Sequence, residues 1–194
     1  MHSTSSIPVL NKALSDSDIS VALAAARSLL QMNQKSGYSV YYAVLTGKRQ
    51  AGQSLLQQQL DQFNTPQKML DFLFNQGIGF LPYAGYGMEV IQDLQKKNNA
   101  PVRAAAAWAL AKDPNPRSGR VLAHACFDKD SMVRAAALRA VASRGDPALL
   151  SIIQPAMQDP NTNVQYMAAA AVLRLATIDS KKVQKSANKS TVTK

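Results

Sequence analysis

The sequence is poor in the residues that carry most enzyme chemistry. Among its 194 residues there are one cysteine, two histidines and one glutamate, Glu89, and aromatic residues make up 6%. A single thiol cannot form an intramolecular disulfide, and the sequence offers no glutamate pair, histidine cluster or thiolate cage. We therefore expect a protein that is not an enzyme and that holds no cofactor and no metal.

Long apolar runs are also missing. The most apolar window, Met69–Met88, is interrupted by Asp71, Pro82 and four glycines, so it is a poor candidate for a membrane span. Residues Met1–Ser6 lack the basic start and the apolar run of a signal peptide. These features predict a protein without membrane insertion and a cytoplasmic location.

Positive charge is present in excess and is unevenly placed. The formal net charge is +10, of which +2 lies in residues 1–97, +4 in residues 98–178 and +4 in residues 179–194. The last segment is rich in lysine, serine and threonine and shows no apolar periodicity. It predicts a disordered basic tail over residues 179–194.

A period of 31 residues organises much of the chain. Val102, Val133 and Val164 are separated by 31 residues each, and similar residues surround all three. A fourth copy surrounds Val21, which leaves room for one more period and about 19 further residues before Val102. We interpret residues 33–97 as a divergent repeat with an insertion.

Each copy combines a polar turn with an alanine-rich helix. The turn carries Asp, Asn or Pro and is typical of a helix N-cap, and the helix follows it directly. A more conventional amphipathic helix precedes each turn, at about residues 87–96, 119–127 and 147–158, and residues 7–14 resemble half of such a hairpin. The repeating unit is therefore a helical hairpin, and the predicted fold is all-α.

The pattern Asp-x-x-x-x-Val-Arg-x-Ala-Ala, seen from Asp128 to Ala137, resembles the HEAT repeat, especially its short bacterial form of the phycocyanobilin-lyase type. The resemblance implies a right-handed α-α superhelix of about five hairpins over residues 1–178. It also implies a ladder of pairs between turn aspartates such as Asp128 and helix arginines such as Arg134. This chain departs from the pattern because Gln165 follows Asp159 at the arginine position, so a continuous ladder is not expected.

The divergent middle holds nine of the twelve aromatic residues, between Tyr38 and Tyr86. Residues 76–87 fit no regular element, and their apolar side chains include Phe80, Tyr83 and Tyr86. Two interpretations stay open for this loop. It either covers the groove or an end of the stack, or it offers anchors to a partner.

Other groups with chemical potential have a structural interpretation. The carboxylate pairs lie where helix caps are expected; they are Asp16 with Asp18, and Asp128 with Asp130. His124 and Cys126 are two residues apart and point to different sides of a helix, so they cannot chelate one metal. Trp108 lies in an alanine-rich helix, where a core position is favoured over a base-stacking role.

The favoured function is a non-catalytic scaffold or adaptor that binds another protein on the concave face of the solenoid. The candidate contact residues are Arg103, Arg134, Arg139 and Gln165 on the second helices and Phe80, Tyr83 and Tyr86 on the loop. Two alternatives come from the resemblance. HEAT-like folds include DNA glycosylases, which bind nucleic acid in a basic groove, and bilin lyases.

Overall fold

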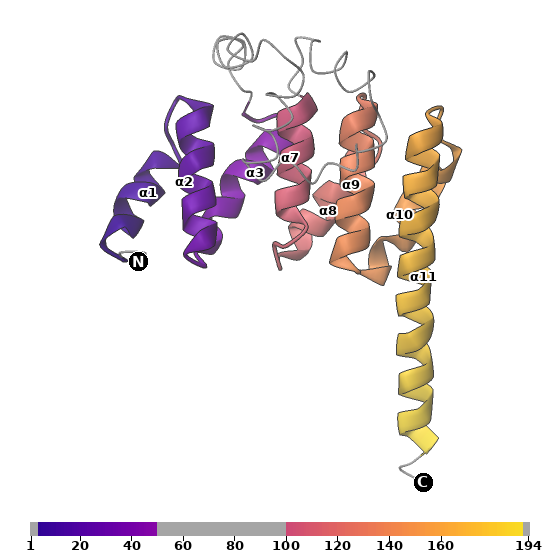
Figure 1. Cartoon of the computed structure of the whole chain (residues 1–194). Helices are drawn as coiled ribbons and strands as arrows, with labels where there is room; N and C mark the ends of the chain where they lie inside the picture. Colours follow the sequence, from indigo (N-terminus) through magenta and orange to yellow (C-terminus); the bar gives the residue numbers. More distant parts are fainter. Residues whose placement is uncertain (1–3, 50–99, 192–194) are drawn as a thin grey trace. The chain divides into compact units, whose positions relative to one another are not determined.

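The computed structural model of the chain describes residues 4–49 and 100–191 (Figure 1). Every regular element in these two ranges is helical. The chain divides into two compact units, residues 1–109 and 110–194, with the boundary inside α7 (Ala100–Leu110). The all-α fold is thus confirmed, whereas the handedness of the superhelix and the count of about five hairpins stay predictions.

Unit 1 contains a helical hairpin near its N-terminus. Its elements before residue 50 are η1 (Thr4–Ser6), α1 (Ile7–Ala13), α2 (Ile19–Gln31), η2 (Lys35–Gly37) and α3 (Tyr38–Leu45). Helix α1 packs on α2, and α2 packs on η2 and α3. The small residues Ala22, Ala25 and Ala26 of α2 are buried together with Leu29. The helices predicted around Val21 and at residues 7–14 are both present.

Unit 2 contains two consecutive hairpins. Its elements are α8 (Pro116–Ala125), α9 (Ser131–Arg144), η3 (Pro147–Leu149), α10 (Leu150–Ile153), η4 (Gln154–Gln158) and α11 (Thr162–Thr191). Helix α8 packs on α9, and α11 packs on α9, α10, η3 and η4. The second helices of the two hairpins, α9 and α11, therefore lie side by side (Figure 1).

The polar turns start the helices by a repeated two-step arrangement. In the turn before α9, the Asp128 carboxylate accepts from the Asp130 N–H at 2.9 Å, and Asp130 then accepts from the Met132 N–H at 2.9 Å. The same two steps precede three other helices, through Asp16 and Asp18 for α2, Asp113 and Asn115 for α8, and Asp159 and Asn161 for α11. Each cap satisfies a helix N–H that has no partner inside the helix. The predicted capping role of the turns is confirmed.

Alanine lets the helices of unit 2 pack on several sides of α9. Eight of its residues are buried; they are Met132, Val133, Ala135, Ala136, Ala137, Leu138, Ala140 and Val141. Because Ala has a single methyl group, neighbouring backbones approach closely on more than one face. The alanine run therefore marks an inner helix rather than a surface one.

The first helix of the last hairpin differs from the prediction. The pattern predicts one helix over residues 147–158, but the structure breaks this segment into η3, α10 and η4. Pro155 lies inside the segment, where it has no N–H to donate and its ring obstructs the preceding turn. The end of α10 at Ile153 follows from this residue.

The C-terminal segment also differs from the prediction. A disordered tail was expected from Asp179, but α11 continues to Thr191 and extends past the elements that it packs on (Figure 1). The residues after Ile178 add little burial, since 179–184 are all exposed. Once the packed part of α11 is formed, each further residue adds one hydrogen bond without a new nucleation step, and Lys, Gln and Ala are good helix formers.

The close approach of η2 to α2 gives a test of the hairpin in unit 1. A Cβ atom at Gly37 would clash with the Ala26 backbone carbonyl. We expect Gly37→Ala to lower the free energy of unfolding by about 1–3 kcal/mol, as overpacking does. Urea unfolding followed by circular dichroism measures the change. Lys35→Ala, an exposed site in the same turn, is the control, and equal stability of the two variants would contradict the packing.

Candidate functional site

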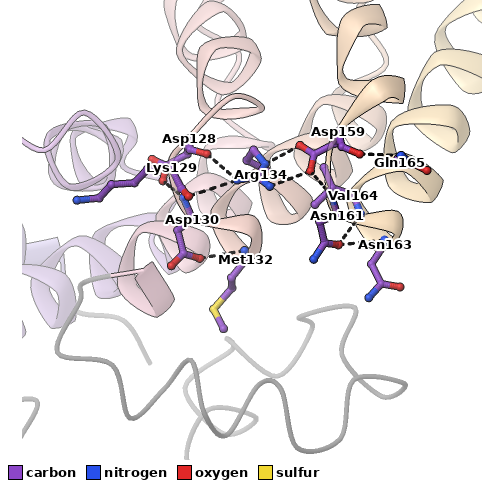
Figure 2. A network of polar contacts seen from close by, with 10 residues as sticks. All are labelled: Asp128, Lys129, Asp130, Met132, Arg134, Asp159, Asn161, Asn163, Val164 and Gln165. Carbon is purple, nitrogen blue, oxygen red and sulfur yellow. Dashed lines mark hydrogen bonds and ion pairs between the residues drawn. The ribbon is translucent and has the colours of Figure 1, made fainter.

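Arg134 joins the two hairpins of unit 2. Its Nε and Nη2 donate to the carboxylate oxygens of Asp159 at 2.6 and 2.8 Å. Its Nη1 donates to the backbone carbonyl of Asp128, in the turn before its own helix, at 2.9 Å. Figure 2 shows the guanidinium between the two turns. The Arg134 and Asp159 side chains are 12% and 6% exposed, so this pair, the repeat clasp, is largely shielded from water.

Gln165 has in α11 the place that Arg134 has in α9. Its Nε2 donates to the backbone carbonyl of Asp159 at 2.7 Å, six residues upstream, as Arg134 does to Asp128 (Figure 2). Glutamine carries no charge and offers no ion pair to a further turn. A pair of the kind that the resemblance implies is thus present at Arg134. Gln165, where a departure from the pattern was expected, keeps only the hydrogen bond to the backbone carbonyl.

The clasp changes the acidity of Asp159. Burial raises the pKa of its carboxyl, but the hydrogen bonds from Arg134 and from the Asn161 N–H, together with the charge of Arg134, lower it more. The net result is a pKa below the ordinary 3.8. Asp159 is therefore held as a carboxylate, which is a structural role rather than that of a general acid.

Three other arginines also bind backbone carbonyls. Arg144, at the end of α9, donates to the carbonyls of Asp113 and Asn115, the latter at 2.7 Å. In unit 1, Arg49 donates to the carbonyls of Leu14 and Asp16 in the turn before α2. Arg174 of α11 donates from Nε to the carbonyl of Ala142 in α9, at 2.7 Å. Together with Arg134, these side chains hold turns and helix ends in place.

Helix α11 carries a second apolar face opposite its buried one. The buried stripe consists of Val164, Ala168, Ala171 and Leu175. The opposite face consists of Tyr166, Ala169, Ala170 and Leu173, all exposed, which we call the α11 strip. Its members lie at positions i, i+3, i+4 and i+7, so they share one side of the helix. Tyr166 is 68% and Leu173 69% exposed.

The 31-residue period relates the α11 strip to the neighbouring helix. Tyr166 corresponds to Ala135 of α9, which is 2% exposed, and Ala170 corresponds to Arg139, which is half-buried. Leu173 corresponds to Ala142, which is half-buried. Tyr166 and Leu173 are thus two large exposed apolar side chains where α9 has alanines.

The remaining chemical groups have structural partners. The Cys126 thiol is buried and donates to the Leu122 carbonyl at 3.3 Å, and burial raises its pKa, so it stays protonated. Asp113 is 8% exposed and accepts from the Ser118 hydroxyl at 2.6 Å. Within residues 4–49 and 100–191, no group of three or more His, Cys, Asp or Glu side chains is placed to hold a metal ion.

The predicted contact residues have different positions in the structure. Arg134 is engaged in the clasp with Asp159, and its role as a contact for a partner stays a prediction. Arg139 and Gln165 are half-buried on α9 and α11, and Arg103 is half-buried on α7. The loop residues Phe80, Tyr83 and Tyr86 lie outside the described residues.

Tyr166 and Leu173 were not among the predicted contacts. The only predicted contact on this helix was the polar residue Gln165. The signal that could have found them is the presence of two apolar stripes on opposite sides of α11, of which one hairpin partner can cover only one.

The HEAT repeats family matches residues 88–174 of the chain, and this segment belongs to that family. HEAT repeats commonly serve as scaffolds for protein interactions, through the extended surfaces that stacked hairpins create. No curated protein matches the chain.

Over the part of the chain that the structure describes, none of the helices combines the length and the apolar character needed to cross a membrane.

Removal of the clasp arginine tests the link between the two hairpins. Arg134→Met leaves the shielded Asp159 without its cation, and we expect a loss of about 3 kcal/mol in the free energy of unfolding near neutral pH. Because the folded pKa of Asp159 lies below its unfolded value, the stabilisation is complete above about pH 4 and is lost as the pH falls through the folded pKa. Urea unfolding at several pH values measures both effects.

Arg174→Met is the matched control for this prediction. Arg174 donates to a neutral carbonyl, so its removal costs about 1 kcal/mol and adds no dependence on acidic pH. If the Arg134→Met variant lost as much stability in acid as the unchanged chain does, the clasp would be refuted as the origin of the acid-dependent loss.

Proposed function

We propose that the chain is a non-catalytic scaffold that binds another protein through the α11 strip and the adjoining face of α9. The observation that carries the proposal is the exposure of Tyr166 and Leu173 on a packed, rigid helix. Large apolar side chains that are about two-thirds exposed on one face are costly unless a partner covers them. Tyr and Leu on a helix are also preorganised anchors, since binding does not have to order the backbone.

The charge of this unit supports an acidic partner. Residues 110–194 carry 13 Lys and Arg against 6 Asp and Glu, a net charge of +7. Arg139 of α9 has the repeat position that Ala170 has in α11. An amphipathic helix with an apolar stripe and acidic flanks fits this combination, and the charges would mainly raise the rate of association.

The remaining predicted contacts keep a place in this proposal. Gln165 borders the α11 strip on the same helix, and Arg139 on α9 and Arg103 on α7 stay predicted contacts. Phe80, Tyr83 and Tyr86 would add anchors from the loop. The proposal also includes a cytoplasmic location and a bacterial source.

A photo-crosslinking amino acid at Ala170 tests where the partner binds. In extracts of cells that make the protein, we expect an adduct at this position and none at Ser151, an exposed site on α10. The captured protein is then purified, and its affinity is measured by titration calorimetry. Tyr166→Ser and Leu173→Ser are each expected to lower the affinity about tenfold or more, as truncation of an anchor does.

Ile152→Ser is the matched control, because Ile152 is an apolar residue of α10 that is 40% exposed. It is expected to leave the affinity unchanged. Equal affinities for the Tyr166 and Leu173 variants and the unchanged chain would contradict the proposal, as would an equal loss with Ile152→Ser.

A further inference from the structure

The outer face of α8 carries a row of exposed polar side chains, two of which are guanidinium groups. Arg117, Arg120 and His124 are exposed, and they lie at positions i, i+3 and i+7 of this helix. Adjacent members are separated by about 4.5 and 6 Å along the helix axis, from a rise of 1.5 Å per residue. The opposite face, with Leu122, is buried against the rest of unit 2. We call this row the α8 row.

No anionic side chain in the described part of the chain pairs with the α8 row. No hydrogen bond or ion pair links the side chains of Arg117, Arg120 or His124 to another residue in 4–49 or 100–191. Helix α8 itself contains no acidic residue. The carboxylate before it, Asp113, is buried and accepts from the Ser118 hydroxyl at 2.6 Å. The row is therefore an uncompensated positive strip, unlike the arginines that bind carbonyls.

An aromatic side chain stands at the end of the α8 row. Phe127 lies two residues after the end of α8 and is 48% exposed. Its position continues the spacing of the row, three residues after His124, and the Phe127 N–H donates to the His124 carbonyl at 3.0 Å, which keeps the helical turn. The two guanidinium groups and the exposed phenyl ring therefore offer a partner both positive charge and an aromatic face.

We infer that the α8 row binds single-stranded nucleic acid, with Arg117 and Arg120 on successive phosphates and Phe127 stacked on a base. A guanidinium forms two parallel hydrogen bonds with a phosphate, and such groups in a row follow a nucleic acid backbone. An exposed phenyl ring stacks on a base only where that base is unpaired, so the ring favours a single strand over a duplex. A run of Asp and Glu side chains offers charge but no ring to stack on Phe127.

Fluorescence anisotropy with the intact chain tests this inference. The probe is a labelled oligothymidylate of about 15 nucleotides, within the range of a single-strand site. Arg117→Gln combined with Arg120→Gln is expected to weaken binding about tenfold or more and to reduce the slope of log K against log salt by about 1.4, since each phosphate contact on a single strand contributes about 0.7. Phe127→Ala is expected to weaken binding without changing that slope.

Lys181→Gln combined with Lys182→Gln is the matched control. It removes the same charge from exposed positions of α11, and we expect its affinity to stay within about twofold of the unchanged chain. An equal loss in this control would overturn the inference, because it would assign binding to net charge alone. Equal binding of a duplex, or equal displacement by polyglutamate, would overturn it too. Circular dichroism confirms that each variant keeps its helices.

Discussion

The register of the two hairpins in unit 2 depends on the repeat clasp. Helices α9 and α11 pack side by side, and four of the eight buried residues of α9 are alanines, which bury apolar surface but do not interlock. Alanine surfaces alone permit neighbouring helices to shift along one another. The bidentate pair between Arg134 and Asp159 has one geometry. The same guanidinium donates a third hydrogen bond to the Asp128 carbonyl, which ties it to the preceding turn. Charge therefore supplies the positional specificity that small side chains lack.

This use of arginine changes the meaning of the net charge. Arg49, Arg134, Arg144 and Arg174 all donate to backbone carbonyls, so part of the excess positive charge satisfies turns and helix ends. Carbonyls at a helix C-terminus carry the negative end of the helix dipole and are natural acceptors for a cation. The charge available to a partner is thus smaller than +10 and is confined to side chains without such bonds.

The sequence predicted local structure better than contacts between repeats. Period, caps and hairpins follow from residues near each other in the chain, such as Asp128 and Asp130, and the structure contains them. The partner of Arg134 is 25 residues away on another turn, and a repeat pattern alone does not say which carboxylate a long side chain reaches. The helical tail was missed because apolar periodicity was weighed above helix propensity. Tyr166 and Leu173 were missed because the exposure of a side chain depends on which neighbouring elements cover it, and the repeat pattern does not give that.

The hairpin design explains how unit 2 offers two different surfaces. Helices α8 and α11 both pack on α9, so each has one face buried toward that helix and one face turned away from it. The outward face of α8 is cationic, with Arg117 and Arg120, whereas the α11 strip is apolar. Because α9 is enclosed and buries more residues than any other helix in the described part of unit 2, substitutions on either outward face change binding chemistry at little cost in stability. Such hairpins suit a binding scaffold because the inner helix stays rigid while the residues on the two outer faces can be replaced.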